Sequence, residues 1–354
     1  MWKLHRYYLK EVLINASIIF LVLTVVVLVA SIYRGIQRSQ GGGPLDALLI
    51  IVLFALDLFQ HLLTISFLLA TVMTFTRAAQ DRELTAIRAA GISPRVPMTS
   101  ALLVGLFLTA LGSFAMHYVI PEVHFRKFRV IADIVRSAFL SLNLGTDRLK
   151  LFDSGFVMTW RAREGEDYRQ CTIYMPKVYG ELRSPIIYVD RVSMPPPTDK
   201  SQDVSIELSG VTDPIAGVSN PGPFRFVIPI GDIAGRDRRD DRDDDVRSDQ
   251  LLAEVIRGVH RKPYEATYTL FRRCCFSLMP AVVAPIGYCL AELARERGRV
   301  TALLMALVPL VLFYLGEVLG ARFLLSTKQP AFAWLPMVLL AAFGLPLCWR
   351  QLRR

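Results

Sequence analysis

Six long apolar blocks, three before and three after a polar stretch, constrain the fold of this chain more than any other feature. Each block can cross a hydrocarbon layer ~30 Å thick, because a helix rises ~1.5 Å per residue. The polar stretch is rich in Asp, Arg, Pro and Gly and cannot lie in lipid, where backbone groups must be satisfied internally. We therefore predict an α-helical membrane protein with one inserted soluble domain. The apolar blocks are residues 13–33, 45–75, 96–119, 274–293, 300–319 and 331–349.

The composition agrees with this prediction. Hydrophobic residues make up 53% of the chain, and the mean hydropathy of +0.39 is typical of membrane proteins. We interpret the net charge of +10 as membrane orientation and attraction to anionic lipid, not as nucleic-acid binding. The first block is longer than the apolar region of a signal peptide, so we expect a retained helix. The predicted parts are 1–120 with spans one to three, 121–269 as the inserted domain, and 270–354 with spans four to six.

The distribution of Lys and Arg predicts the orientation. With the N-terminus in the cytoplasm, these residues concentrate on the cytoplasmic side, as the positive-inside rule requires. Six spans then return the C-terminus to the cytoplasm and leave the inserted domain outside. The cytoplasmic segments carry thirteen, namely Lys3, Arg6, Lys10, Arg77, Arg82, Arg88, Arg95, Arg295, Arg297, Arg299, Arg350, Arg353 and Arg354, and the short outer loops carry four, Arg34, Arg38, Arg322 and Lys328.

The inserted domain is predicted to be all-β. Five short segments rich in β-branched and aromatic residues are separated by Gly and Pro, which favours a sandwich or roll. Cys171 is the only cysteine of this domain, so it has no internal disulfide. The expected strands are residues 156–160, 171–175, 186–189, 204–208 and 224–228.

A charged run at 236–249 mixes Asp and Arg densely. We interpret it as a solvated linker, because such a segment cannot bury a core. A calcium site is the alternative, although the spacing lacks an EF-hand pattern and the arginines would compete for the carboxylates. After the run, Leu251, Leu252, Val255 and Val259 share a helical face, which predicts a short amphipathic helix leading back to the membrane.

No motif indicates an enzyme. A nucleotide-binding P-loop needs Gly-Lys-Ser/Thr, and none of the eight lysines follows a glycine. The chain also lacks Gly-x-Ser-x-Gly and His-Glu-x-x-His, and no Cys/His spacing resembles a zinc site. We therefore predict no catalytic residues, no metal and no cofactor on this chain.

Polar residues inside the second block form one group of candidate site residues, because lipid makes such groups costly. Asp57 and His61 are four residues apart and share a helix face, with Gln60 beside them. They either face a polar cavity or mark the outer boundary of the span. The block is longer than one crossing needs, which favours the boundary.

Two further candidates lie near the outer ends of other spans. Glu317 precedes Arg322 by five residues, and the two form either a cavity rim or an interfacial ion pair. Arg34 and Arg38 end the first block. They either extend to the lipid head groups, as basic side chains commonly do, or form a cationic rim for a phosphorylated ligand.

The segment 80–91 is the sharpest local signal. Leu84 and Ile87 give a short helix one apolar edge, and Gly91 is a helix stop. On the inner face, such a helix is either a docking element for a cytoplasmic partner or an ordinary interfacial loop helix.

Over nearly its whole length the chain resembles the lipopolysaccharide-export permeases of the LptF/LptG (YjgP/YjgQ) type. The resemblance rests on the three-plus-three layout and on short motifs in a fixed order. These are Arg82-Glu83-Leu84, Ala89-Ala90-Gly91-Ile92-Ser93, Arg272-Arg273 with Pro280 and Pro285, Arg297-Gly298-Arg299, Phe313-Tyr314 with Glu317, Pro330, and Trp334-Leu335-Pro336.

The resemblance implies a permease that pairs with a second LptF/LptG-type permease and a cytoplasmic LptB-like ATPase dimer, with ATP hydrolysed on that partner. It implies an inner-membrane location, a periplasmic β-jelly roll, and passage of lipopolysaccharide to an LptC/LptA-like periplasmic bridge. The segment 80–91 matches the family's coupling helix, with Glu83 at its acidic contact to the ATPase and Arg82, Leu84, Ile87, Arg88 and Gly91 around it. Arg34 and Arg38 lie where family members place basic residues near lipid phosphates.

Two alternative functions stay open at the level of sequence. One is a permease of the same build for another anionic lipid. The other is a membrane-anchored sensor whose outer β-domain binds a ligand, which predicts no ATPase partner.

Overall fold

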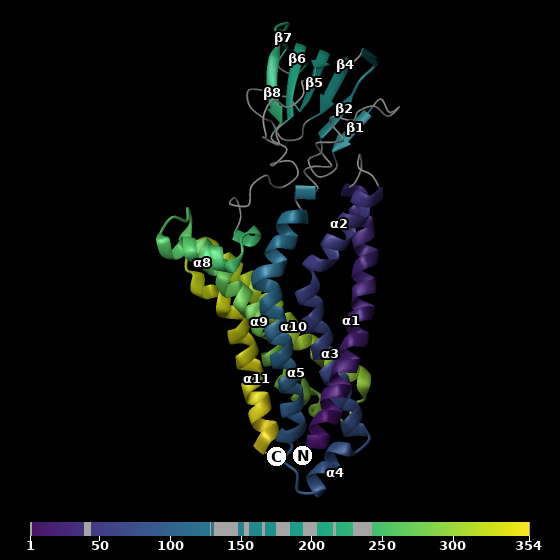
Figure 1. Cartoon of the computed structure of the whole chain (residues 1–354), viewed down its shortest axis with the longest axis vertical. Helices are drawn as coiled ribbons and strands as arrows, with labels where there is room; N and C mark the ends of the chain where they lie inside the picture. Colours follow the sequence, from purple (N-terminus) through teal and green to yellow (C-terminus); the bar gives the residue numbers. More distant parts are fainter. Residues whose placement is uncertain are drawn as a thin grey trace. The chain divides into compact units, whose positions relative to one another are not determined.

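The computed structural model describes residues 2–38, 44–127, 129–130, 148–151, 156–164, 167–174, 185–193, 204–214, 217–228 and 243–353. They belong to two compact units (Figure 1). We call Met1–Val29, Ala55–Val123 and Arg242–Arg354 the helical unit, and Ala30–Phe54 and His124–Asp241 the strand unit.

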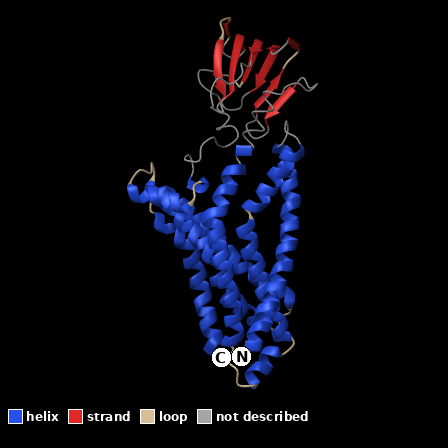
Figure 2. Cartoon of the chain, viewed as in Figure 1, coloured by secondary structure: helices blue, strands red, loops and turns tan. Residues whose placement is uncertain are grey.

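Six spans are confirmed: six of the described helices are long and apolar enough to cross a membrane (Figure 2). They are α1 (Trp2–Arg38), α3 (Phe59–Gln80), α5 (Arg95–Phe114) with its π-helical continuation η1 (Ala115–Val119), α9 (Pro263–Leu293), α10 (Arg299–Thr327) and α11 (Leu335–Arg353). Shorter elements are α2 (Pro44–Asp57), α4 (Glu83–Ala89), α8 (Ser248–Arg257) and the 3₁₀ turns η3 (Asp243–Asp245) and η4 (Pro330–Trp334).

The second apolar block is not one helix. Helix α2 ends at Asp57, Leu58 forms a turn whose N–H donates to the Ala55 carbonyl at 3.3 Å, and α3 begins at Phe59. The block is longer than one crossing requires, so α3 alone spans and α2 is a separate apolar helix.

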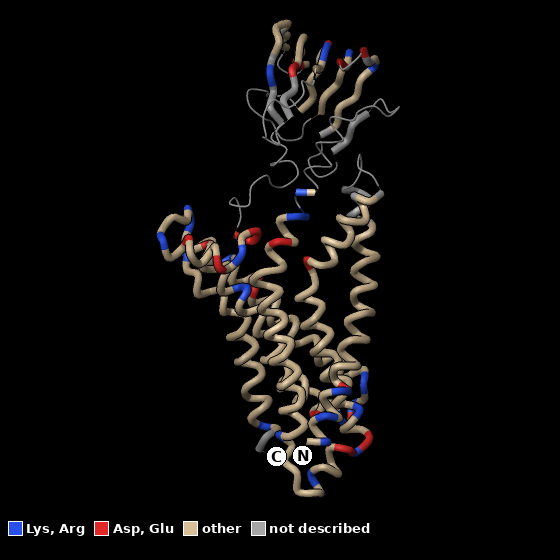
Figure 3. The backbone as a smooth tube through the Cα atoms, viewed as in Figure 1, with Lys and Arg blue, Asp and Glu red and all other residues tan. Residues whose placement is uncertain are grey.

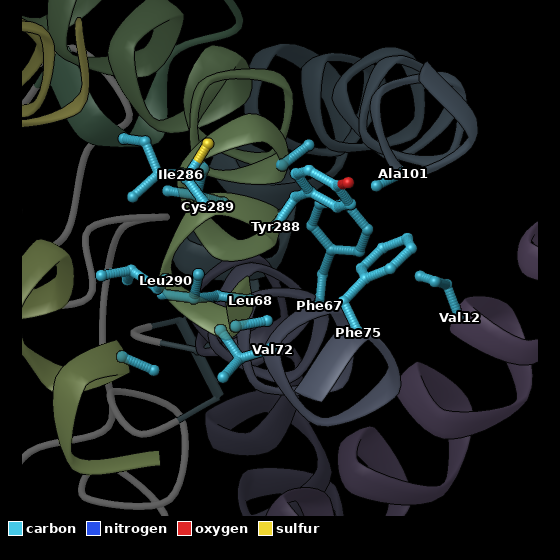
Figure 4. Packing of buried hydrophobic residues seen from close by; sticks show 14 of the residues in the cluster. Val12, Phe67, Leu68, Val72, Phe75, Ala101, Ile286, Tyr288, Cys289 and Leu290 are labelled. Atoms are coloured by element: carbon cyan, nitrogen blue, oxygen red, sulfur yellow. The ribbon is translucent and has the colours of Figure 1, made fainter. Parts of the chain in front are cut away.

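Helices α3 and α9 form the centre of the helical unit. In α3, 78% of the most apolar window is buried, and in α9 72%, whereas in α1 only 11% is buried. Phe75 of α3 meets Tyr288 of α9 edge to face, with ring centroids 4.9 Å apart (Figure 4). Helix α5 approaches α9 closely at Gly105, where a Cβ would lie 2.9 Å from the Pro280 carbonyl oxygen. Small residues permit such close helix crossings in membranes.

Charged residues of the helical unit gather at two levels with a charge-free band between them (Figure 3). Residues 58–76, 274–291 and 300–316 contain no Asp, Glu, Lys or Arg. Stretches of this length cover roughly 25–29 Å of helix, close to the thickness of a hydrocarbon core. We call the end of the unit that carries both chain termini the terminus end, and the other the opposite end (Figure 1).

The strand unit contains one antiparallel sheet, which confirms the β-class prediction for the insert. The central order is β1-β2-β4-β5-β6-β7, with β3 also pairing β4 and β8 also pairing β6. The strands are β1 (Arg148–Leu151), β2 (Phe156–Thr159), β3 (Ala162–Glu164), β4 (Asp167–Tyr174), β5 (Ile186–Ser193), β6 (Val204–Asp213), β7 (Val218–Asn220) and β8 (Phe224–Ile228).

All five predicted strands are present as β2, β4, β5, β6 and β8. The sequence pattern missed β1, β3 and β7 because these short strands together contain one β-branched residue, Val218, and no aromatic residue. Ile187, Val189 and Val192 of β5 are buried, and Val189 lies directly opposite the buried Cys171 of β4. Burial raises the pKa of the Cys171 thiol to about 12, which keeps it protonated and unreactive.

Candidate functional site

The predicted inner helix is α4, and both of its ends are defined by unusual backbone conformations. It begins after Arg82, which has a left-handed φ of 59°. It ends at Ala89, and Gly91, two residues further on, has φ +75°. The Gly91 N–H donates to the Arg88 carbonyl at 2.9 Å and the Ile92 N–H to the Ile87 carbonyl at 3.1 Å. This pair of bonds is a Schellman motif, which favours glycine. The helix stop predicted at Gly91 is therefore confirmed.

Glu83 connects α4 to α1 and α3. Its carboxylate accepts hydrogen bonds from the Tyr8 hydroxyl at 3.2 Å and from the Tyr7 hydroxyl at 3.5 Å. Arg77 of α3 lies 3.3 Å from Glu83 and 2.8 Å from Glu11 of α1. The Glu83 side chain is still 31% exposed, so a partner can reach it.

Two more contacts connect the same region to α9 and α10. Arg88 forms an ion pair with Glu292 at the end of α9. Arg299, the first residue of α10, donates from Nε to the Gln80 side chain at 3.2 Å. Leu84 is buried, whereas Arg82 and Arg88 are exposed. Helix α4 and the end of α3 are thus connected to α1, α9 and α10, while Arg82, Thr85 and Arg88 stay exposed.

At the opposite end, Glu317 forms its ion pair with Arg272 and not with Arg322, the partner that the sequence suggested. Arg272 of α9 contacts it at 2.8 Å through Nη2 and at 3.0 Å through Nε, and lies 3.6 Å from Asp244. Arg322 is exposed. Residues five apart do not face each other on a helix, whereas α9 and α10 are neighbours in space. The sequence pattern singled out Arg272 only within the motif Arg272-Arg273 and did not predict its contact with Glu317.

The polar residues of the second block are divided between two environments. His61 Nδ1 lies 2.9 Å from the Tyr314 hydroxyl of α10, and the His61 ring packs edge to face on Phe276. Gln60 is 1% exposed and donates from Nε2 to the Phe276 carbonyl at 3.0 Å. Asp57 is half-buried at the last residue of α2. Gln60 and His61 therefore bind α3 to α9 and α10.

A crevice separates α1 from the rest of the bundle within the charge-free band. Near the terminus end α1 is held by hydrogen bonds of 2.8 Å from His5 to Ser100 and from Asn15 to Thr74. Further along lies a cavity of about 440 Å³. Its lining is almost wholly apolar, which suits acyl chains and excludes a head-group site. It is formed by Leu13, Ala16, Ser17, Phe20, Leu21, Thr24, Val25 and Leu28 of α1, Leu63 and Ser66 of α3, and Leu108 of α5.

Sequence reasoning missed this crevice, because Leu, Val and Phe line it as they fill any span. The side chains of Arg34 and Arg38 lie outside the described part of the structure. Of the charged run 236–249, residues 243–249 are described. Within the described residues, no group of three or more His, Cys, Asp and Glu is placed to hold a metal ion.

Comparison with known proteins adds one positive finding. A family model described as lipopolysaccharide export system permease LptF/LptG matches residues 6–182. The match includes α1 from residue 6 onward and all of α2 to α5, and with them every residue that lines the crevice. A sequence comparison with curated proteins gives no match.

Proposed function

The chain belongs to the LptF/LptG family of lipopolysaccharide export permeases, and on that premise we propose that it is a non-catalytic transmembrane subunit of an ATP-driven lipopolysaccharide exporter. Its partners are a second permease of this type and a cytoplasmic ATPase dimer that binds and hydrolyses ATP. The substrate leaves the inner membrane for a periplasmic bridge protein. The observation that carries the proposal is the family match over residues 6–182.

We place the terminus end in the cytoplasm and the strand unit in the periplasm. The positive-inside bias supports this orientation, because the basic residues of the short connections concentrate at the terminus end. The inner-membrane location is proposed from the membership of a family of export permeases.

Helix α4 is proposed as the coupling element for the ATPase, with Glu83 and the exposed residues Arg82 and Arg88 at the contact. The support is mechanical. Because α4 is bonded to α1 and α3 through Glu83 and to α9 through Arg88, a displacement of α4 moves several spans together. The polar network also holds α4 in one orientation before a partner binds, which lowers the ordering cost of docking.

The crevice beside α1 is proposed to take acyl chains of the lipid. Arg34 and Arg38, at the end of the same helix, are proposed to bind lipid phosphates. Asp57, Gln60, His61, Glu317 and Arg322 stay candidates for cavity or gate residues. Of these, Gln60 and His61 bind one helix to another, and Glu317 binds Arg272, so they are proposed to act by controlling helix separation and not by direct lipid contact.

A crosslinking experiment tests the substrate. A photoreactive amino acid replaces Ser17, which lines the crevice, and the matched control replaces the next residue, Ile18, which is 57% exposed and outside the lining. Both variants are expressed with the partner permease and the ATPase, irradiated with and without ATP, and analysed by mass spectrometry.

We expect an adduct that contains lipid A at position 17, reduced by ATP turnover, and only phospholipid at position 18. An adduct at 17 that lacks lipid A would support export of another anionic lipid, since the apolar crevice does not select a head group. Purification without any ATPase would support the sensor and refute the exporter.

A further inference from the structure

Helix α8 carries apolar side chains on two adjacent sides, and only one of them is covered. Leu251 is fully buried and packs with Val255 against Val246 and Ala266. Leu252 is 48% exposed, Ile256 76% and Val259 75%. Leu252 and Ile256 are four residues apart and therefore share one side of the helix. This open side is apolar, although the helix lies outside the six spans.

The orientation of α8 is fixed at both ends. Arg273 of α9 donates to the Val246 carbonyl at 2.9 Å and to the Ser248 hydroxyl at 2.8 Å, and His117 lies 2.7 Å from that hydroxyl. At the other end Gly258, with φ +69°, ends the helix in a Schellman motif, and His260, two residues further on, lies 2.9 Å through Nε2 from the Asp243 carboxylate. The open apolar side is therefore held in one direction.

The contacts of Arg273 also give the depth of α8. The charge-free band of α9 begins directly after Arg273, so this residue marks the edge of the hydrocarbon layer. Ser248, the first residue of α8, is hydrogen-bonded to it. Leu251 packs against Ala266, about two turns further out along α9. Figure 3 agrees: charged residues reappear around α8 at the opposite end of the helical unit. The helix thus lies at head-group depth.

The charges around the open side match anionic lipid. Arg257 ends α8, and Arg261 and Lys262 follow in the connection to α9, all three exposed. Lys262 lies 3.0 Å from Glu265, and the acidic Asp249 near Leu252 is paired with Arg247 at 3.2 Å, so Arg257 and Arg261 are the basic groups to consider for lipid. An amphipathic helix with exposed apolar residues and neighbouring basic residues typically lies in the plane of the bilayer surface. Basic residues near an anionic surface strengthen such binding.

We propose that residues 248–262 form an interfacial anchor that binds the phospholipid surface at the opposite end of the helical unit. Leu252, Ile256 and Val259 insert at the boundary between head groups and acyl chains, and Arg257 and Arg261 bind lipid phosphates. The chain that returns from β8 to α9 is then attached to the bilayer before it enters the membrane. A stable protein interface buries ~800 Å² on each partner. The surface of three exposed apolar side chains is far smaller than this area, so lipid is the favoured occupant.

The test uses the full chain in nanodiscs of phosphatidylcholine and phosphatidylglycerol at four to one. A fluorescent amino acid replaces Ile256 in one variant and Gln250, an exposed residue on the polar side of α8, in the control. Lipids brominated along the acyl chain serve as quenchers. Because Ile256 is 76% exposed, its replacement leaves the packing of α8 on α9 intact.

We expect a blue-shifted emission at 256 that brominated lipid quenches several-fold more strongly than emission at 250. In a second variant, Arg257→Gln with Arg261→Gln, quenching at 256 should fall in nanodiscs that contain phosphatidylglycerol and change little in pure phosphatidylcholine. Equal quenching at 256 and 250 would overturn the proposal. It would also be overturned if emission at 256 shifted only when the partner permease was added, because a protein would then cover this side.

Discussion

Replacing Arg273 with Met is expected to release the segment 243–248 from α9. The guanidinium donates to three backbone carbonyls, those of Asp243 at 2.9 Å, Asp244 at 3.1 Å and Val246 at 2.9 Å, and to the Ser248 hydroxyl at 2.8 Å. Arg273 is only 4% exposed. Met fills a similar volume and supplies no donor, so the change removes the hydrogen bonds without leaving a large cavity.

The expected magnitude follows from these four bonds. A hydrogen bond to a charged group contributes ~1.5–3 kcal/mol net. The cost of keeping the guanidinium out of water offsets part of the sum, and the carbonyls regain water when the segment opens. We therefore count only two of the four bonds, each at ~1.5 kcal/mol. The free energy of local opening is then expected to fall by ~3 kcal/mol. A loss of that size increases the open population roughly 100-fold.

Hydrogen exchange with mass spectrometry measures this population directly, because amide exchange reports local opening. Amides in peptides covering 246–257 should exchange roughly 100-fold faster in Arg273→Met, while peptides within α3 stay unchanged. Arg273→Lys should fall between the two, since it keeps the charge but loses the fork of donors. Arg322→Met, at an exposed arginine, is the matched control. Exchange in 246–257 within threefold of the unsubstituted protein would refute the reasoning.

Three further predictions follow from other contacts. Glu83→Gln keeps the shape of the side chain but removes the charge that binds Arg77, so transport-coupled ATP hydrolysis should fall several-fold, while Thr85→Ser, on the exposed side of α4, leaves it unchanged. Gly105→Leu should lower the free energy of unfolding by ~1–3 kcal/mol, and with it the melting temperature, because any side chain there meets the Pro280 carbonyl. Leu106→Ala, on the exposed face, serves as control in the same melting assay. Burial raises the pKa of Asp243 above its usual 3.8, so the native state binds the proton of this carboxyl more tightly than the unfolded state does. The stability that Asp243 contributes is therefore lost as the pH rises through its pKa in the folded protein. Asp243→Asn should flatten that part of the melting temperature profile as the pH rises above 3.8, and an unchanged slope would contradict the assignment.

Sequence patterns predicted the elements whose signal is local. Hydropathy identified six spans because burial in lipid requires a continuous run of apolar residues. The alternation of apolar and polar residues, bounded by Gly and Pro, identified five strands. Gly91 identified a helix stop, because a left-handed φ restricts the residue type at that position alone. The excess length of the second block indicated that Asp57 lies at a boundary of the span, but not that a separate helix ends there.

Only the tertiary structure decided which distant groups meet. The partner of Glu317 is Arg272 on another helix, and the partners of Arg273 are mostly backbone carbonyls, which every residue has and no sequence pattern distinguishes. The crevice beside α1 depends on how far two apolar surfaces lie apart, and hydropathy is the same for a packed and an open apolar face. For the same reason the two apolar sides of α8 look alike in the sequence, and only packing against α9 covers one of them and leaves the other exposed.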